Sequence, residues 1–164
     1  MHMSHSLRSN LAVVMAAAAL HFISPVAPAH AAEGAKAAIA RQLGAYERAL
    51  NASDVDAVMK LYATDVVFMP QNSPPVEGRD AVRAAYRRVF ATVKLDVRFA
   101  IDEVKPLSRD WAYARTRSTG TVKLLAGDKT SAPEANQELF LLHREPDGQW
   151  RLARYIFATS NPSK

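Results

Sequence analysis

Few side chains of this sequence are of a type and in a position to do chemistry, and one group of them follows a predicted strand. Val66–Met69 is an apolar run long enough for a short strand, and it leads directly into the proline-rich loop Pro70–Pro75. Ligand sites favour such junctions, because a rigid strand holds its last side chain over a cavity. Met69 occupies that position, followed by the amides of Gln71 and Asn72, although turn formation explains Asn72 equally well. Methionine carries no proton, so the junction predicts an apolar ligand contact rather than a base.

The first 31 residues have the features of an export signal. Arg8 precedes the apolar run Leu11–Ile23, which is shorter than the roughly 20 residues that span a bilayer. The stretch ends in the small-x-small pattern Ala29-His30-Ala31. The sequence therefore predicts cleavage after Ala31, a periplasmic or secreted protein with no membrane segment in its mature form, and one domain over residues 32–164. A short buried helix is the alternative for this stretch.

Removal of that leader would leave little for metal or nucleophilic chemistry. The chain has no Cys, and of its five His only His143 lies beyond residue 31. A His-based metal site, a His-centred triad and thiol chemistry are therefore not expected, and the scattered glycines form no phosphate-binding turn. The sequence predicts no metal and no cofactor. Strand parity turns His143 away from Glu138, toward the surface or an interface.

The charge of the mature chain does not indicate nucleic-acid binding. Residues 32–164 carry 20 basic and 16 acidic side chains, a formal charge of +4. The nearest approach to a basic patch is Arg79, Arg83, Arg87 and Arg88, of which the first three recur every four residues and form one solvated helical stripe. Because no aromatic residues are interleaved with this stripe, we expect no nucleic-acid partner.

Helical spacing dominates the first half of the mature chain. Apolar residues at spacings of four, three and four predict an amphipathic helix over Ala35–Leu50. Ser53 and Asp56 match a capping box, with Ser53 as the N-cap of a short second helix. A third helix is expected from Asp80, with Phe90 among its inward residues. Three helices are therefore gathered before the long strands.

From residue 95 the hydrophobic period changes to two, which is typical of half-buried strands. The tight turn Pro146-Asp147-Gly148 is expected to join the last two. Helices followed by antiparallel strands indicate an α+β fold, with three N-terminal helices packed in a strongly curved antiparallel sheet. Such a sheet encloses a cone, and the cone is the candidate site. The expected strands are 95–105, 111–125, 136–145 and 149–160.

The order of these elements and several motifs resemble a known family. The segment LYATDVVFMP, the loop ending EGRDAVRAAY and the closing strand WRLARYIF are similar to the nuclear-transport-factor-2-like (NTF2-like) superfamily, which includes ketosteroid isomerase and the SnoaL-like cyclases. FMPQNSPPVEGRDAVRAAY, WAYARTRSTGTV and EANQELFLL further resemble the SgcJ/EcaC branch of DUF4440-type proteins, whose customary label is oxidoreductase. The resemblance spans essentially all of residues 32–164 and implies a cone-shaped fold.

The resemblance to ketosteroid isomerase implies roles for three positions. That enzyme uses a carboxylate base together with an oxyanion hole made of a Tyr hydroxyl and a protonated acid. In a gap-free overlay its Tyr falls on Tyr46, its protonated acid on Glu138 and its base on Met69. Tyr46 and Glu138 are therefore the catalytic candidates, and the proton carrier is missing unless Glu77 or Asp80 replaces it.

Glu138 has two interpretations. If its side chain points inward beside Phe140, desolvation favours the protonated form, which donates a hydrogen bond to a ligand oxygen. Alternatively, Glu138 forms an ordinary cross-strand ion pair with Arg115, Arg117 or Arg154. Both interpretations place it on a cone strand.

The aromatic candidates also have alternatives. Tyr46 has the spacing of a core residue whose hydroxyl finds a buried partner. The resemblance implies that Phe157 lines the pocket and that Tyr155 shares its side, although plain core packing explains both residues as well.

Polar side chains on the cone strands favour a ligand site over a vestigial cavity. We therefore expect an exported protein that binds a small apolar or aromatic ligand bearing an oxygen, as a homodimer formed through the exposed faces of the long strands. The alternatives are a dimeric interaction module with a vestigial cavity, and an acid-base enzyme for a polyketide-like or steroid-like substrate, which needs a base. The expected ligand contacts are Met69, Gln71, Phe90, Arg115, Arg117, Asn136, Phe140, Tyr155 and Phe157.

Overall fold

The computed structural model describes residues 27–127 and 130–161. Three helices precede four long strands, as predicted, with a short two-strand element between the second and third helices. Most of the predicted leader lies outside the described residues. The elements are α1 (Ala27–Ala52), α2 (Val55–Leu61), β1 (Tyr62–Met69), β2 (Val76–Glu77), α3 (Arg79–Thr92), β3 (Val93–Pro106), β4 (Trp111–Leu124), β5 (Ser131–Arg144) and β6 (Trp150–Thr159).

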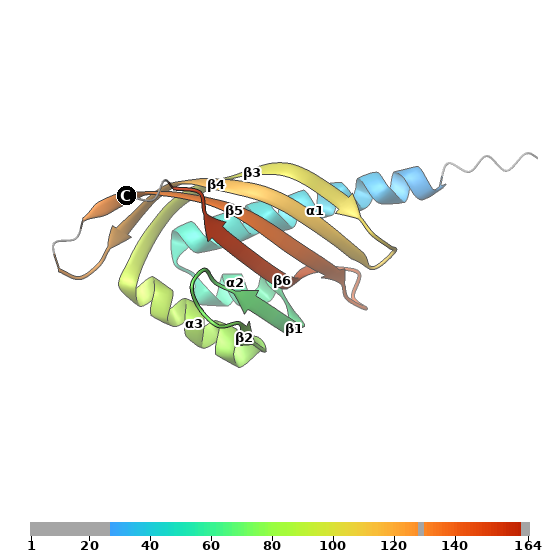
Figure 1. Ribbon diagram of the computed structural model, residues 1–164. Coiled ribbons are helices and arrows are strands. Elements are labelled where there is room, and N and C mark those ends of the chain that lie inside the picture. The colour runs from blue at the N-terminus through green and yellow to red at the C-terminus, as the bar shows by residue number, and fades with distance from the viewer. Residues whose placement is uncertain (1–26, 128–129, 162–164) are drawn as a thin grey trace, which may run out of the picture.

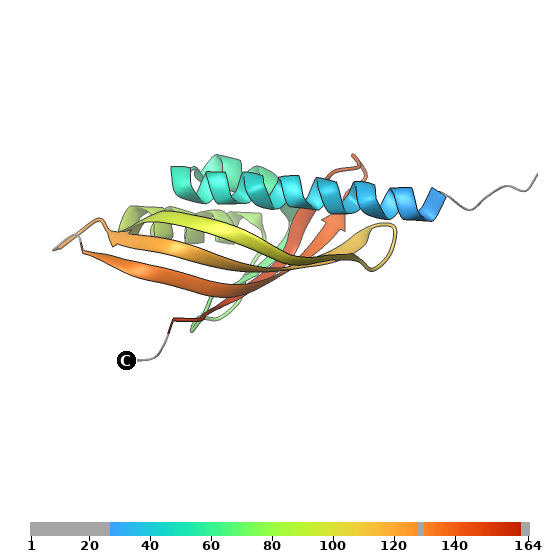
Figure 2. The same cartoon turned by 90° about the horizontal axis from the view of Figure 1, so that it is seen from above.

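The six strands form one sheet in the order β2-β1-β6-β5-β4-β3. The long strands pair antiparallel with their neighbours, but β1 runs parallel to β6, so the sheet is mixed rather than purely antiparallel. Parallel pairing requires a long connection, and here the connection contains α3 and the other long strands. The sheet curls over the helices without closing, and all three helices lie on one side of it (Figures 1 and 2). The predicted α+β cone is therefore confirmed, with this one correction to the strand directions.

The core fills the space between the helices and the inner face of the sheet. The predicted apolar face of α1 is buried, from Ile39 with no exposed surface to Leu50 with 7%. On the sheet, alternate residues turn inward, so Phe140 and Leu142 of β5 pack beside Leu152 of β6. Within the described residues no helix is both long enough and apolar enough to cross a bilayer.

The start of α2 differs from the prediction. Ser53 has a φ of 56°, and its backbone N–H donates to the carbonyl of Leu50, so Ser53 ends α1. The N-cap of α2 is Asp54, whose carboxylate accepts a hydrogen bond of 2.9 Å from the backbone N–H of Ala57. Asp56 reaches across to Arg83 of α3 instead of back to the cap.

Two glycines have conformational roles in the sheet. Gly148, with a φ of 79°, completes the predicted turn between β5 and β6, and its N–H donates to the carbonyl of Glu145. Gly120 of β4 lies so close to β3 that a Cβ atom there would be 2.0 Å from the carbonyl oxygen of Asp96. Because Gly120 has no side chain, the paired backbones of β3 and β4 can approach each other closely at this point.

Candidate functional site

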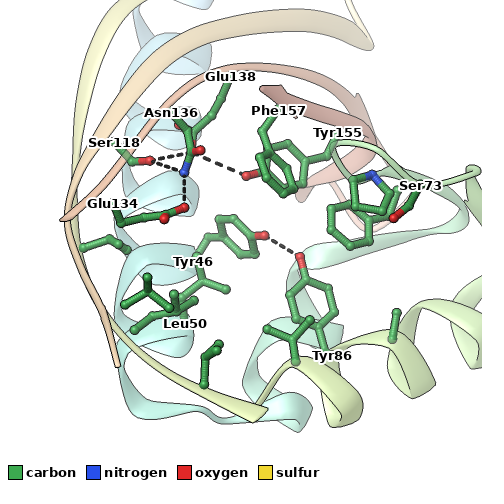
Figure 3. Close-up of a pocket in the computed structure, with 18 of the residues that line it drawn as sticks. Tyr46, Leu50, Ser73, Tyr86, Ser118, Glu134, Asn136, Glu138, Tyr155 and Phe157 are labelled. Atoms are coloured by element: carbon green, nitrogen blue, oxygen red, sulfur yellow. Dashed lines mark hydrogen bonds between the residues drawn. The ribbon is translucent and has the colours of Figure 1, made fainter. Parts of the chain in front are cut away.

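A cavity of about 420 Å³ lies between α1, α3 and the inner face of the sheet (Figure 3). Most of its wall is apolar, and its polar groups come mainly from β4, β5 and three tyrosines. The residues that line it are Tyr46, Leu50, Phe68, Pro70, Ser73, Val76, Ala85, Tyr86, Arg88, Val89, Val93, Leu95, Val97, Phe99, Ser118, Val122, Glu134, Asn136, Glu138, Tyr155 and Phe157.

Glu138 is the buried acid of this cavity. Its side chain is 5% exposed, and its carboxyl oxygens accept hydrogen bonds from Thr116 Oγ1, from Ser118 Oγ at 2.9 Å and from the Tyr155 hydroxyl at 3.4 Å. Desolvation by burial raises the pKa of Glu138, and the three hydroxyl groups offset this only in part. The environment therefore favours the protonated acid.

Strand register builds this cluster from sequence alternation. Residues Thr116 and Ser118 turn inward on β4, and the antiparallel register places them opposite Glu138 and Asn136 of β5. Asn136 Nδ2 donates a hydrogen bond of 3.3 Å to Ser118 Oγ. Four polar side chains thus share one inner face across two strands, and Figure 3 shows three of them, Ser118, Asn136 and Glu138.

A chain of three tyrosine hydroxyls forms the other polar part of the site. Tyr86 of α3 hydrogen bonds to the hydroxyl of Tyr46 on one side and, at 2.7 Å, to the hydroxyl of Tyr62 on the other. All three rings are buried, and burial is the largest cause that raises the pKa of each hydroxyl, so all three remain protonated at neutral pH.

Counting hydrogens shows what this chain presents to a ligand. Three hydroxyl groups carry three hydrogens but make two bonds with one another. Tyr62 has no exposed surface, and Tyr86 is its one hydroxyl partner among the described residues, so the Tyr62 hydrogen is used in that bond. The remaining hydrogen belongs to Tyr46 or Tyr86, and both residues line the cavity. The tyrosine chain therefore offers one donor to the cavity that Glu138 also lines.

Parallel aromatic rings give part of the wall a flat shape. Phe68 of β1 stacks on Tyr155 of β6 with 5.5 Å between ring centroids and 10° between planes. Tyr155 also stacks on the core residue Phe140 at 4.3 Å and 1°, and Phe68 also stacks on Tyr86 at 5.4 Å and 17°. These rings are rigid and apolar, and they suit a planar ligand.

The structure brings five of the predicted site residues together at the cavity. Tyr46, Asn136, Glu138, Tyr155 and Phe157 line it. Glu138 does not pair with Arg115, Arg117 or Arg154, because these arginines lie on the opposite face of the sheet. The choice left open for Glu138 is thus decided for the inward orientation.

Arg115 and Arg117 do not face the cavity. Both are exposed on the outer face of β4 and pair with Asp102 of β3. They alternate with the inward residues Thr116 and Ser118, and the period of two excludes them from the cone.

Four other predicted contacts also lie elsewhere. Met69 pairs with exposed Ile156 on the outer face, and its neighbour Phe68 takes the inward position. Gln71 accepts a hydrogen bond from the backbone of Thr159 and fastens the loop to β6. Two aromatic residues belong to the core rather than to the cavity wall: Phe140, which stacks on Tyr155, and Phe90, which packs on Tyr86.

Sequence reasoning missed several site residues. The periodicity predicts that Tyr62 and Tyr86 are buried, but nothing in their spacing shows that their hydroxyls meet. Thr116 and Ser118 follow from the parity of β4 once Glu138 is placed inward. Glu134 lines the cavity as a second acid, two positions before Asn136 on the same face.

The described part of the chain contains no group of three or more His, Cys, Asp or Glu side chains arranged to hold a metal ion. His143, the one His of the predicted mature chain, stacks on Trp111 with 4.4 Å between ring centroids and lies away from Glu138, as parity predicts.

Comparison with known proteins agrees with this geometry. The family described as the SnoaL-like domain matches residues 43–153. Among solved structures, a ketosteroid isomerase-like protein from Erwinia carotovora atroseptica is 37% identical, with a TM-score of 0.73 over 77% of this chain and 96% of that one. No protein of curated function matches the sequence.

Two further structures share the fold at lower identity. A conserved protein from Planctomyces limnophilus is 22% identical with a TM-score of 0.69, over 77% of this chain and 98% of that one. An NTF-2 like protein from Shewanella oneidensis is 23% identical with a TM-score of 0.59, over 75% and 98%. The narrower resemblance to the SgcJ/EcaC branch of DUF4440 proteins stays a prediction. The matched segment, the curled sheet over three helices and the enclosed cavity together show that this chain belongs to the SnoaL-like domain family, with the NTF2-like fold.

Proposed function

We propose that the protein binds a flat, mainly apolar small molecule through a carbonyl-type oxygen. That oxygen accepts one hydrogen bond from the tyrosine chain, through Tyr46 or Tyr86, and a second from protonated Glu138. The observation that carries the proposal is the burial of Glu138 beside three hydroxyl groups, with no cation paired to it among the described residues.

Burial of a carboxyl group without a cation costs stability, because the charged form loses its hydration. A purely structural position would be filled more favourably by an apolar residue. At Glu138 the cost is reduced when the acid is protonated, and a protonated acid can act as a donor. Two donors in one cavity, if both reach the same ligand atom, suit an oxygen that carries negative charge in a complex or a transition state.

The dimensions of the cavity fit this class of ligand. Its volume of about 420 Å³ lies within the range of about 300–1,000 Å³ that is usual for small-molecule sites. The stacked rings of Phe68 and Tyr155 favour a planar molecule. Similarity to a ketosteroid isomerase-like protein supports a ketone as the oxygen-bearing group.

Native mass spectrometry tests the proposal. We would purify residues 32–164 gently and record spectra before and after denaturation, and then titrate the empty protein with planar ketones and with their deoxygenated analogues. The proposal expects tighter binding of the ketones and a loss of about tenfold or more in Glu138→Gln and Tyr46→Phe. Glu103→Gln and Tyr113→Phe are matched controls, because neither residue lines the cavity. Equal affinity for ketone and hydrocarbon would contradict the proposal.

We also propose that two copies pair through the outer face of the sheet. Leu139 of β5 and Ile156 of β6 are paired neighbours there, each 45% exposed, and Met69 of β1 is paired to Ile156 on the other side. A row of exposed apolar residues on a protein surface favours an interface. Light scattering should give a dimer mass for the native chain and a monomer mass for Leu139→Glu. A clean dimer that binds no ligand would favour the interaction module instead.

Export is proposed on the leader sequence alone. Cleavage after Ala31 would leave α1 to begin at Ala32, with its buried face from Ile39 to Leu50 intact. Sequencing of the N-terminus after expression with the native leader tests this proposal. A periplasmic product that begins at Ala32 is expected, and an uncleaved cytoplasmic chain would contradict it.

A further inference from the structure

The strand β3 forms one edge of the sheet. In the order β2-β1-β6-β5-β4-β3 it pairs with β4 on one side, and on its other side the described residues supply no further strand. The backbone N–H and C=O groups of such an edge can pair with a strand of another molecule unless something covers them. The strand at the opposite edge, β2, has two residues, whereas β3 has 14. The edge of β3 is therefore the one that needs a cover.

Two side chains of α1 bond to this edge. Asn51 Nδ2 donates a hydrogen bond of 2.8 Å to the carbonyl of Val97, and Asn51 Oδ1 accepts one of 2.9 Å from the N–H of the same residue. One turn earlier in α1, Glu47 Oε2 accepts a hydrogen bond of 2.7 Å from the N–H of Phe99. We call Glu47 and Asn51 the edge cap. In Figure 2 the C-terminal half of α1 runs beside β3, as these bonds require.

The side-chain amide of Asn51 takes the place of a strand backbone. In an antiparallel sheet, the two residues of a hydrogen-bonded pair exchange both of their N–H···O=C bonds. Val97 makes this pair of bonds with a single amide, which supplies one donor and one acceptor as a peptide group would. The edge at Val97 therefore has the geometry of a strand-pairing position, and Asn51 occupies it.

The sequence around Val97 is complementary to a second copy of itself. When two β3 strands are paired antiparallel with Val97 opposite Val97, Asp96 of each copy lies opposite Arg98 of the other, and Leu95 lies opposite Phe99. Asp96 and Arg98 are both exposed in the single chain. Opposite charges and apolar side chains are each favourable in directly opposed positions. Because the twofold axis passes through Val97, the contact is closed and gives a dimer.

The edge cap and this pairing exclude each other. A second strand would occupy the space of the last turn of α1, which contains Asn51 and ends at Ala52, so the turn must first withdraw. Helix ends fray, and the bonds of the edge cap oppose that step here. Arg98 Nη1 lies 3.3 Å from the Glu47 carboxylate in the capped state, so on pairing it would exchange Glu47 for Asp96 of the second copy.

We propose that the edge of β3 is a latent surface for a second copy of this chain, and that Glu47 and Asn51 keep this surface closed. The contact would extend the sheet sideways by strand addition. It is therefore separate from the outer-face contact through Leu139 and Ile156, and it does not depend on the ligand site.

Light scattering at increasing protein concentration tests the closure of the edge. All proteins carry Leu139→Glu, which removes the outer-face contact, so that the mass reports on the edge of β3. With the edge cap intact, the mass should be that of one chain. Asn51→Ala combined with Glu47→Ala removes the three bonds and should double the mass as the concentration rises. Glu47→Gln is the matched control, because its amide oxygen can still accept the bond from Phe99, and its mass should stay that of one chain.

A charge exchange tests the register of the dimer. In the variant without the edge cap, Asp96→Arg places two arginines opposite each other on both sides of Val97 and should weaken the dimer by about tenfold or more. Addition of Arg98→Asp restores opposite charges at both places and should restore the dimer.

Three results would overturn the inference. A variant without the edge cap that keeps its native circular dichroism and the mass of one chain would show that the edge does not accept a second copy. A dimer of unchanged strength in Asp96→Arg would show that the copies meet elsewhere. If the double alanine variant does not fold, Asn51→Asp keeps the acceptor for the N–H of Val97 and removes the donor to its carbonyl. That variant should also form dimers, and the mass of one chain at all concentrations would contradict the proposal.

Discussion

Replacement of Tyr86 by Phe removes one oxygen atom, the hydroxyl that joins Tyr46 to Tyr62. The two partners would then differ in what they can bond to. Tyr46 lines the cavity, where water can take the place of the lost partner. Tyr62 has no exposed surface, so its hydroxyl would be left without a partner in the core.

The expected cost follows from that difference. An unsatisfied buried hydroxyl costs about 1–3 kcal/mol, so Tyr86→Phe should lower the free energy of unfolding by about 2 kcal/mol. Tyr62→Phe removes the terminal hydroxyl and leaves the bond between Tyr86 and Tyr46 in place, at a cost of less than about 1 kcal/mol. The same chemical change at adjacent members of one chain should therefore have unequal effects.

Urea unfolding measures this inequality. With a slope of about 2 kcal/mol per molar urea, the midpoint should fall by about 1 M in Tyr86→Phe and by less than about 0.5 M in Tyr62→Phe. The slopes should be unchanged, since neither substitution alters the surface exposed on unfolding. Equal midpoint shifts, or a larger shift in Tyr62→Phe, would refute the hydrogen-bond order inferred for the three tyrosines.

Three other substitutions test the site and the sheet. Burial raises the pKa of Glu138 in the folded state, so the native protein loses stability as pH rises from the ordinary carboxyl range through the raised pKa. Because Glu138→Gln cannot ionise, urea midpoints at pH 5 and 8 should show that this variant gains stability relative to the native protein at the higher pH. Parallel pH profiles for the two proteins would show that Glu138 is not desolvated. Gly120→Ala forces a methyl group against the Asp96 carbonyl and should lower the free energy of unfolding by about 1–3 kcal/mol, measured by thermal unfolding. An unchanged melting temperature would mean that β3 and β4 do not approach closely there. Phe68→Ala should lower the free energy of unfolding by about 3–5 kcal/mol and Met69→Ala by less than half of that, because Phe68 is the buried member of the pair. A larger loss in Met69→Ala would mean that β1 is shifted by one residue, with Met69 facing the core.

The fold is accessible from the sequence because its signals are local. The period of α1 and the alternation of β4 and β5 each follow from burial of one face, and the turn at Gly148 follows from the turn-forming residues Pro146, Asp147 and Gly148. The parallel pairing of β1 with β6 has no such signal, since it joins segments about 90 residues apart along the chain.

The site is predictable only where parity is applied consistently. Alternation turns Glu138 and Asn136 inward, and the same rule applied to β4 selects Thr116 and turns Arg115 away. Parity also distinguishes Phe68 from Met69. The gap-free overlay selects Met69, whereas Phe68 lines the cavity, and a shift of one residue reverses the face of every side chain on a strand.

What could not be predicted depends on distances between elements. The hydroxyls of Tyr62 and Tyr86 meet because α3 packs against the start of β1, and no sequence spacing encodes that contact. Glu134 likewise gains significance only because the cavity extends along β5 as far as its carboxylate.

The pairing of β1 with β6 also determines when the cavity forms. The strands β3 to β6 follow one another along the chain and close short loops, so they can associate early in folding. The contact of Tyr62 with Leu152 closes a loop of about 90 residues, and its closure costs more conformational entropy than closure of the short loops between β3 and β6. Phe68 and Tyr155 meet only in that late step. We therefore expect the cavity to be the last part of the molecule to assemble, so that a chain that ends before β6 has no site and a ligand added during refolding stabilises the final, closed state.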